Sequence, residues 1–407
     1  MRIAMVSEHA SPLAALGGVD AGGQNVHVAH LAAALAARGH VVDVYTRRDA
    51  VDLPALVPLV DGVTVVHVDA GPPAEIPKDA LLPHMEAFGG ELAAHLLERP
   101  ADLLHAHFWM SGVAAREAAR SVGLPLVQTF HALGSVKRRH QGAEDTSPPS
   151  RVAVETELAA EADAVLATCH DEVRELAELG TPQDRVRVVP CGVDVDLFTP
   201  QGPVGGPPRR EEHRVVTVGR LVERKGVEEV VRSLALAPAT ALARTELLVV
   251  GGPSASHLGI DAEAQRLRAL AEELGVADRV HLLGRVDHSE LPALLRSADV
   301  VVAAPWYEPF GIVPLEAMAC GRPVVGSAVG GLLDTVDEGT TGALVPPRDA
   351  VALAAALGPL LDDAPRREAW GRAARERVVA GFSWREVAAR TEDVYEGVLA
   401  RTRLEAL

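Results

Sequence analysis

The chain alternates short apolar runs rich in β-formers with longer segments of helical spacing. "RIAMVS" (2–7), "VVDVYT" (41–46) and "VTVVHV" (63–68) are three such runs. Between the first two, "VHVAHLAAALAARGH" (26–40) has the apolar spacing of a helix and ends at Gly39. Apolar strands joined by helices predict a parallel, doubly wound α/β sheet.

The alternation is interrupted once and then restarts. "PCGVDVDLFTPQGPVGGPPRR" (190–210) is crowded with Pro and Gly, which is typical of a connection between domains. We therefore predict two Rossmann-like domains, over residues 1–192 and 193–381. The remaining predicted strands are 102–107, 125–130, 164–168 and 186–190 before the interruption, and 214–219, 246–252, 279–284, 299–304, 323–328 and 342–346 after it.

Length and charge narrow the classes of function. A chain of 407 residues fits two domains of about 200 residues. Its net charge of −17 disfavours nucleic acid as a partner, and its strongest basic run, "KRRH" (137–140), is too short for stable association with an anionic membrane. No apolar run reaches the roughly 20 residues that span a bilayer.

Cysteine and lysine usage add two indications. Cys169, Cys191 and Cys320 are scattered and lack metal-ligand spacing, as expected for buried thiols in a cytoplasmic protein. Lys78, Lys137 and Lys225 are the three lysines among 39 Lys and Arg residues in total. Since a Lys offers a compact ammonium where Arg offers a planar fork, these positions are candidates for binding anions.

Ligands of doubly wound sheets bind beyond the carboxyl ends of the strands, so we expect the site in the cleft between the domains. The loop "DAGGQNVHV" (20–28) leads into a helix, where Gly22 and Gly23 would let a phosphate approach the backbone. A plain tight turn remains an alternative. The loop lacks G-x-G-x-x-G, which disfavours nicotinamide cofactors. His131, directly after a strand, is a second candidate.

Two loops of the second half carry charged groups. Arg220 and Lys225, in "VGRLVERKG", are five positions apart and could neutralise a diphosphate. In "WYEPFGIVPLEA" (306–317), Glu308 precedes a helix and Glu316 lies in its first turn. We interpret the two carboxylates as ionised hydrogen-bond acceptors that grip two parts of one ligand, so that neither needs a raised pKa.

"RLVERKG" followed by "EPFGIVPLE" resembles the retaining glycosyltransferases of the GT-B fold, family 4. "DAGGQNVHV", "HAHFWMSG" and "TFHALGSVK" are similar to the branch that holds sucrose-phosphate synthases and the inositol-phosphate N-acetylglucosaminyltransferase of mycothiol biosynthesis. The resemblance implies two Rossmann-like domains that face each other across a cleft, with a last helix, 382–407, that crosses back to the first domain.

The resemblance also implies residue roles on the donor side. Arg220 and Lys225 would hold the diphosphate, Glu308 a sugar hydroxyl and Glu316 the ribose, while His131 would face the reacting sugar. Further donor contacts would come from the backbone near the base, the sugar and the phosphates, at Gly22, Gly23, Arg285, Val286, Phe310, Gly311 and Ile312.

On the acceptor side the chain departs from the inositol-phosphate pattern. Lys78 and Arg151 match two of the phosphate-gripping residues, but Phe108 and Ala132 stand where Tyr and Thr are expected. Each lost hydrogen bond to a charged group costs about 1.5–3 kcal/mol. An inositol phosphate, another cyclitol, a sugar phosphate or a natural-product intermediate all remain open as acceptors. The other acceptor-side candidates are His9, Asn25 and Lys137.

The expected reaction is front-face transfer from a nucleotide sugar, with uridine favoured by the resemblance, and without metal or cofactor. "HAH" (105–107) has two histidines without a third ligand nearby, which disfavours a metal site there. The alternatives are a sugar-nucleotide 2-epimerase, a non-catalytic sugar-nucleotide-binding protein and a lipid-acceptor transferase. The expected partners are a nucleotide sugar and a small polar acceptor, and a homodimer is compatible with the sequence.

Overall fold

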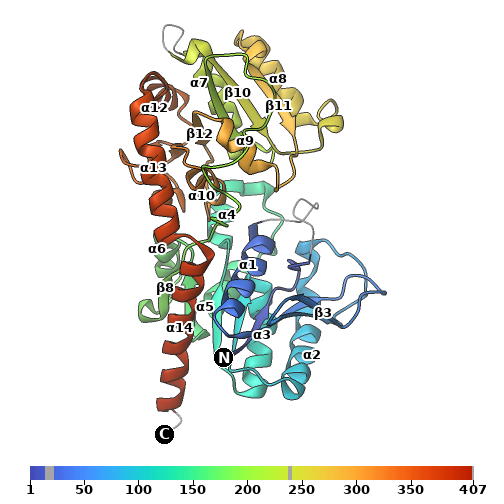
Figure 1. Ribbon diagram of the computed structural model, residues 1–407. Coiled ribbons are helices and arrows are strands. Elements are labelled where there is room, and N and C mark those ends of the chain that lie inside the picture. The colour runs from blue at the N-terminus through green and yellow to red at the C-terminus, as the bar shows by residue number, and fades with distance from the viewer. Residues whose placement is uncertain (14–22, 237–240, 406–407) are drawn as a thin grey trace. The chain divides into compact units, whose positions relative to one another are not determined.

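The computed structural model describes residues 1–13, 23–236 and 241–405. The chain forms two compact units. Unit 1 consists of Met1–Gly192 together with Trp384–Leu407, and unit 2 is Val193–Ser383. Each unit contains one sheet with helices on its faces (Figure 1).

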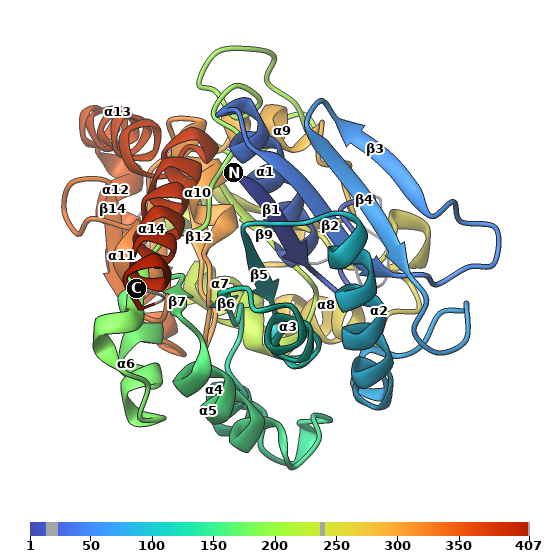
Figure 2. The same cartoon turned by 90° about the horizontal axis from the view of Figure 1, so that it is seen from below.

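Among the described residues, eight strands form the unit 1 sheet, in the order β3-β4-β2-β1-β5-β6-β7-β8. All neighbours pair in parallel except β3 and β4, which are antiparallel at one edge (Figure 2). The strands are β1 (Arg2–Val6), β2 (Val41–Arg47), β3 (Leu56–Val60), β4 (Val63–Val68), β5 (Leu103–His107), β6 (Leu126–Thr129), β7 (Ala164–Ala167) and β8 (Val186–Val188).

The central strands of unit 1 are buried along their whole length, as two covered faces require. Two of the covering helices, α2 and α3, approach closely at Gly89, where an added Cβ would lie 2.9 Å from the Ala114 carbonyl oxygen. The unit 1 helices are α1 (Gly23–Ala37), α2 (Met85–Glu98), α3 (Trp109–Val122), α4 (Gly134–Gln141), α5 (Arg151–Glu161), α6 (His170–Glu178) and α14 (Trp384–Glu405).

The last helix, α14, is part of unit 1 and packs beside α1 (Figure 1). Its Tyr395 is fully buried, and the Tyr395 hydroxyl lies 2.6 Å from Nδ1 of His105 on β5. At its start, Trp384 stacks on His30 of α1 with ring centroids 5.4 Å apart. The far end of the sequence therefore completes the core of the first unit.

Unit 2 has a sheet of six described strands, all parallel, in the order β11-β10-β9-β12-β13-β14. Its core is built from two layers of aliphatic side chains, one on each face. The strands are β9 (His213–Val218), β10 (Thr245–Val250), β11 (Val280–Gly284), β12 (Val300–Ala303), β13 (Val324–Ser327) and β14 (Gly342–Val345). The helices are α7 (Val227–Leu236), α8 (Ala262–Glu273), α9 (Leu291–Ser297), α10 (Ile312–Ala319), α11 (Leu332–Thr335), α12 (Ala350–Asp362) and α13 (Ala364–Gly381).

The chain passes between the units twice, at neighbouring points. The Val193 amide donates to the Phe382 carbonyl oxygen at 2.9 Å, and Val193 also forms a parallel bridge with Ser383. The predicted fold class, two Rossmann-like doubly wound units, is confirmed. The predictions did not include β3, whose alternating exposure reflects its place at the sheet edge.

Replacing Tyr395 with Phe should lower the stability of the protein. The variant keeps the ring in the core but removes the hydroxyl bonded to His105, which leaves a buried imidazole nitrogen without that partner. We expect a loss of about 1–3 kcal/mol, measured by urea unfolding with a unit 1 probe. Glu396→Gln, on an exposed position of the same helix, is the control. Equal stability of the two variants would contradict the assigned bond.

Candidate active site

Lys225 is held in a tight turn that follows strand β9. It closes a 3₁₀ turn, Glu223–Lys225, and Gly226 after it has φ +66°. A Cβ at Gly226 would lie 1.8 Å from the Ala304 carbonyl oxygen, so only glycine fits. The turn thereby packs against the residue that follows β12 and fixes the ammonium at the carboxyl edge of the sheet.

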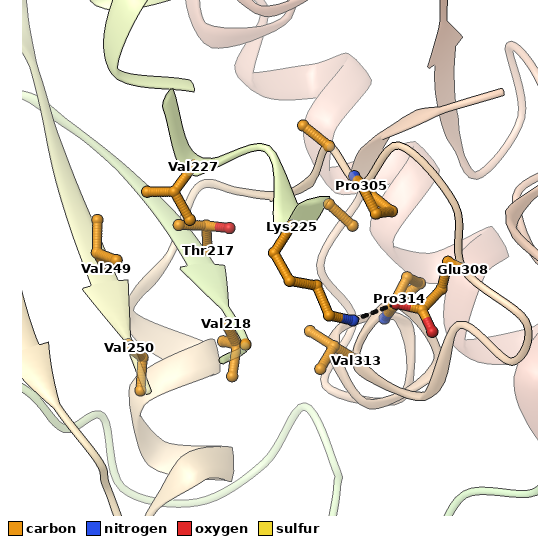
Figure 3. Close-up of a pocket in the computed structure, with 13 residues that line it drawn as sticks. Thr217, Val218, Lys225, Val227, Val249, Val250, Pro305, Glu308, Val313 and Pro314 are labelled. Carbon is orange, nitrogen blue, oxygen red and sulfur yellow. Dashed lines mark hydrogen bonds and ion pairs between the residues drawn. The ribbon is translucent and has the colours of Figure 1, made fainter. Parts of the chain in front are cut away.

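Lys225 forms an ion pair with Glu308, 83 residues further along the chain (Figure 3). Both side chains are partly buried. Burial alone would raise the pKa of Glu308, but Lys225 and Arg224 together with the Phe310 amide outweigh it and hold this pKa below 4.5. The carboxylate is therefore ionised, as predicted.

The loop that carries Glu308 is clamped by two glycines after β13. The Gly331 amide donates to the Glu308 carbonyl oxygen at 2.8 Å. A Cβ at Gly330 would lie 2.2 Å from that same oxygen, and one at Gly331 would lie 2.9 Å from the Phe310 carbonyl oxygen. Neither glycine is among the predicted site residues, although "VGG" (329–331) directly after a predicted strand is a usable signal.

Helix α10 begins immediately after this loop. Gly311 is its N-cap residue with φ +69°, and Ile312 is its first helical residue. The backbone amide of Phe310 already serves the Glu308 carboxylate. The first-turn amides of the helix remain at the same edge as Lys225, where a helix N-terminus favours an anion.

Glu316 lies in α10, buried, with Oε1 2.9 Å from Nε2 of His288. Burial raises the pKa of this carboxyl, and the neighbouring His288 opposes the rise. This raised pKa is at odds with our interpretation that neither carboxylate would need one. His288 was not predicted, since a single histidine in "VDHSE" gives no signal by spacing or pattern.

The remaining donor-side candidates differ in their accessibility. Arg220 is exposed on the loop after β9. The Arg285 amide donates to the Pro253 carbonyl oxygen at 2.9 Å, so this amide is engaged within the fold, while Val286 follows it, half-buried. The cavity beside Lys225 and Glu308 has a volume of about 30 Å³, room for about one water. A ligand larger than water would bind at its mouth.

In unit 1, several predicted residues gather where β1 and α1 meet. Gly23 is the first residue of α1, and Gly22 lies outside the described residues. Asn25 is buried and donates to the Ser11 carbonyl oxygen at 3.0 Å. His9 follows β1, with Nδ1 2.6 Å from Oε1 of the buried Glu8.

Phe108 forms the centre of the predicted acceptor side. It directly follows β5 as the N-cap residue of α3, with φ +84° and ψ 157°, a conformation that costs a non-glycine residue about 1–3 kcal/mol and is found mostly at functional sites. The Lys78 ammonium lies 5.5 Å and the Arg151 guanidinium 5.1 Å from its ring centroid. His9 packs edge-on against the same ring.

Two of the predicted acceptor-side cations, Arg151 and Lys137, are held by acids. Arg151 is buried and donates to Glu155 at 2.7 Å, to Ser147 at 3.1 Å and to the Ala132 carbonyl oxygen at 2.5 Å. Lys137 donates to the same Ser147 at 2.9 Å and lies 3.0 Å from Asp145. The structure thus brings the predicted acceptor-side residues Lys78, Phe108, Ala132, Lys137 and Arg151 into one polar cluster.

His131, after β6, adopts φ +63° and is buried. Its Nε2 lies 2.9 Å from Nδ1 of His107, at the end of β5. Burial, helped by the nearby His27, keeps the pKa of His131 well below 6.5. A neutral imidazole at this edge can donate or accept one hydrogen bond on each ring nitrogen.

Within the described ranges, no group of three or more His, Cys, Asp or Glu side chains is placed to hold a metal ion. None of the helices in this part of the chain combines the length and the apolar character needed to span a membrane.

Both halves of the chain match families of known proteins. Residues 21–197 match the family described as Glycosyltransferase Family 4, and residues 206–377 match Glycosyl transferases group 1. The chain is 39% identical to the D-inositol 3-phosphate glycosyltransferase of Acidothermus cellulolyticus, over 100% of this chain and 92% of that protein. The chain belongs to glycosyltransferase family 4.

Other relatives agree with this family 4 assignment. D-inositol 3-phosphate glycosyltransferase 1 of Catenulispora acidiphila is also 39% identical, over 98% of this chain and 96% of that protein. The sucrose-phosphate synthase of Thermosynechococcus elongatus superposes with a TM-score of 0.86 at 34% identity, over 98% and 99% of the two chains. This glycosyltransferase is therefore a hexosyltransferase of the GT-B fold with a sugar-nucleotide donor.

The fold alone is shared more widely. The Anabaena protein HepE, solved in complex with UDP-glucose, superposes with a TM-score of 0.70 at 20% identity, over 98% of this chain and all of that one. The predicted family is confirmed, whereas the roles of the individual site residues remain predictions.

The Glu316–His288 pair should make the stability of this glycosyltransferase depend on pH. Its hydrogen bond to Glu316 raises the pKa of His288 above 6.5, so the native state binds the proton more tightly than the unfolded chain. The resulting stabilisation is present below about pH 6.5 and is lost as the pH rises through the raised pKa.

The measurement is the difference in Tm between the wild type and His288→Gln, taken at intervals from about pH 6 to about pH 8. We expect the difference to be largest at the acidic end. His257→Gln, which removes an exposed histidine bonded to serines only, is the control. A difference that is constant over this range would show that His288 does not gain a proton from the pair.

Proposed function

We propose that this chain is a retaining hexosyltransferase that moves a glucose- or N-acetylglucosamine-type sugar from UDP to a small hydroxylated acceptor. The observation that carries the proposal is the Lys225–Glu308 pair at the N-terminus of α10. It places a cation for a diphosphate beside a carboxylate for sugar hydroxyls. The HepE complexes with UDP and glucose and with UDP-glucose support uridine as the base on a shared fold.

Lys225 and Glu308 have enough hydrogen-bonding groups to bind a nucleotide sugar while they stay paired with each other. An ammonium has three N–H donors, and a carboxylate has two oxygens. Glu308 accepts from Lys225 through Oε2 and also from the Phe310 amide, and since each carboxylate oxygen has two lone pairs it could still accept from a sugar hydroxyl. Lys225 in turn has further donors for the diphosphate. The pair would set the distance between these two parts of the donor, and Arg220 and the first turn of α10 would add positive potential.

Glu316 would accept both ribose hydroxyls. Its bond to His288 holds the carboxylate in place before the nucleotide binds. Because His288 lies in the loop after β11, close to Arg285 and Val286, the same loop would bring the base and the ribose to one place. Burial raises the pKa of Glu316, and the bond to His288 opposes this rise.

The acceptor would bind in unit 1, at the cluster around Phe108. Arg151 and Lys137 are each balanced by an acid, Glu155 and Asp145. A phosphate would find less positive charge there than three cations suggest, and two hydroxyl groups of the inositol-phosphate pattern are missing at Phe108 and Ala132. The cluster therefore suits a hydroxylated ring, with or without one phosphate held by Lys78.

In the proposed mechanism the acceptor hydroxyl attacks on the face from which UDP departs. The acceptor oxygen bonds to the anomeric carbon, the carbon–phosphate-oxygen bond breaks, and the departing phosphate oxygen takes the acceptor proton. The protein contributes positioning and charge stabilisation through Lys225, Arg220 and the helix N-terminus. Since these groups stabilise the leaving diphosphate, the mechanism requires neither a cofactor nor a metal. We propose the cytoplasm as its place of action.

Lys225→Ala should lower kcat by about 10²- to 10³-fold, the range seen when one group that stabilises transition-state charge is removed. The measurement is UDP release from UDP-glucose in the presence of acceptor. Arg390→Ala, which removes a cation from an exposed position of α14, is the control and should keep the wild-type rate. Near-normal turnover of Lys225→Ala would exclude Lys225 as the diphosphate ligand.

Lys78→Ala should raise the acceptor KM about 10- to 100-fold, the effect of one lost hydrogen bond to a charged group. The donor KM should stay the same. Running the assay with D-inositol 3-phosphate and with myo-inositol separates two roles for Lys78. An effect confined to the phosphorylated acceptor assigns Lys78 to the phosphate, and no effect on either acceptor removes it from the site.

Incubation with UDP-glucose alone tests the class of reaction. Without an acceptor, a transferase leaves the configuration of the sugar unchanged, whereas a 2-epimerase inverts it at carbon 2. A non-catalytic binding protein neither changes the sugar nor transfers it to any acceptor. NMR analysis of the product's anomeric configuration tests retention. An inverted product would contradict the front-face mechanism.

A further inference from the structure

Glu8 is a buried acid in the loop after β1, and one of its carboxylate oxygens is occupied by a residue of α3. The Glu8 side chain is fully shielded from solvent. Its backbone amide donates to Oγ of Ser111, in the first turn of α3, at 3.0 Å. Since this Oγ accepts from the amide, its own hydrogen is available, and it donates to Oε2 of Glu8. Ser111 thus fixes both the backbone and the carboxylate of Glu8.

The other carboxylate oxygen of Glu8 faces His9. Oε1 lies 2.6 Å from Nδ1 of the imidazole, so a hydrogen must lie between the two atoms. Because an imidazole is a stronger base than a carboxylate, and an ionised carboxylate can only accept, this hydrogen belongs to Nδ1. A neutral imidazole has one ring hydrogen. With that hydrogen on Nδ1, the lone pair of the neutral ring is on Nε2.

Nε2 of His9 is open beside the predicted acceptor cluster. In the part of the chain that the structure describes, Nε2 has no hydrogen-bond partner, yet it does not belong to the buried atoms that lack one. The His9 side chain is 13% exposed, so a ligand can reach this nitrogen. The ring packs edge-on against Phe108 with centroids 5.0 Å apart, and Lys78 and Arg151 lie over the same Phe108 ring. A ligand of the cluster would therefore meet an accepting nitrogen as well as two cations.

We propose that Glu8 is a positioning residue that holds the hydrogen of His9 on Nδ1, so that Nε2 accepts a hydrogen bond from a hydroxyl of the acceptor. Glu8 itself is buried and acts only through His9. A lone pair suits a hydroxyl and repels an ionised phosphate oxygen, so a phosphate of the acceptor would lie at Lys78 instead. The role toward the acceptor rests on the proposed function, whereas the position of the hydrogen in the ligand-free protein does not.

Glu8→Gln should reverse the tautomer of His9 without a change of shape. The Ser111 hydroxyl still needs an acceptor at the place of Oε2, so the amide oxygen of the new side chain lies there and its NH₂ group faces His9. The NH₂ group donates to Nδ1, and the hydrogen of His9 moves to Nε2, which can then no longer accept. We expect the acceptor KM to rise about 5- to 10-fold, the effect of one lost hydrogen bond between neutral groups. The Kd for UDP should stay the same.

A double-mutant cycle separates a positioning role from a merely structural one. If Glu8 acts only through His9, Glu8→Gln should raise the acceptor KM in the wild type but not further in His9→Ala. The acceptor is D-inositol 3-phosphate or myo-inositol, whichever the wild type accepts, with UDP-glucose as donor. Glu91→Gln, on an exposed position of α2, is the control and should keep the wild-type KM. Additive effects of the two substitutions would show that Glu8 acts by another route and would overturn the proposal.

The direct measurement is NMR of the full-length, ligand-free protein labelled with ¹⁵N-histidine, at about pH 8.5, above the range in which imidazoles usually titrate. The spectrum distinguishes a ring nitrogen with a hydrogen from one with a lone pair, and His9 is assigned by comparison with His9→Ala. Hydrogen on Nδ1 in the wild type and on Nε2 in Glu8→Gln supports the proposal. Hydrogen on Nε2 or on both nitrogens in the wild type, or the same tautomer in both proteins, overturns it.

The two proposals fail in different ways. If the wild type transfers no sugar to any acceptor, the proposed function is wrong, while the wild-type spectrum still decides where the hydrogen of His9 lies. If transfer occurs and Glu8→Gln keeps the wild-type acceptor KM, His9 does not accept from the acceptor, and the proposed function stands without it. Circular dichroism and Tm of the variants show whether a change in KM reflects a loss of folding.

Discussion

Parallel pairing of the strands is the constraint on which the site depends. In a parallel sheet all carboxyl ends lie at one edge, so loops far apart in sequence meet there. In unit 2 this brings Lys225, after β9, to Glu308, after β12. In unit 1 it brings His107 and His131 together from the ends of β5 and β6. His107 is the last residue of β5 and Lys225 closes a 3₁₀ turn, while Glu308 and His131 lie in loops. Both pairs are positioned by the register of the strands that precede them.

Much of the fold could be predicted from the sequence because parallel strands buried on both faces have a simple pattern. Runs such as "VVDVYT" and "DVVVAA" contain little besides β-branched and small residues and coincide with β2 and β12 to within one or two positions. β3 escaped because "LVPLV" contains Pro58, pairs antiparallel and alternates in exposure at the sheet edge. The hydrophobic pattern is therefore least informative for a strand at the edge of the sheet.

The candidate site could be predicted only as a set of loops. The charged residues after β9 and before α10 were visible, because acids and cations beside glycines at strand ends stand out. The residues that contact these charged groups were not visible in the sequence. His288 bonds to Glu316 across 28 positions, and Gly330 packs against Glu308 through backbone atoms alone. These relations follow from loop conformation, which residue type and spacing do not encode. The raised pKa of Glu316 likewise arises from burial.

Charge balance in each unit's candidate site follows from ion pairs of this kind. Lys225 with Glu308, Arg151 with Glu155 and Lys137 with Asp145 are each neutral together. Buried or half-buried charges are tolerated in this way without a substrate. In the proposed function, a diphosphate at Lys225 would add negative charge to a pair that is neutral on its own.

The place of α14 in unit 1 has a consequence for how the protein is made. The ribosome synthesises all of β1 to β8 first and all of unit 2 next, and only the final residues supply Trp384 and Tyr395, which cover α1 and β5. Domains generally fold as units, in the order of their synthesis. Here the second unit is complete before the first, so the nascent N-terminal half emerges with part of its core uncovered until α14 has been synthesised.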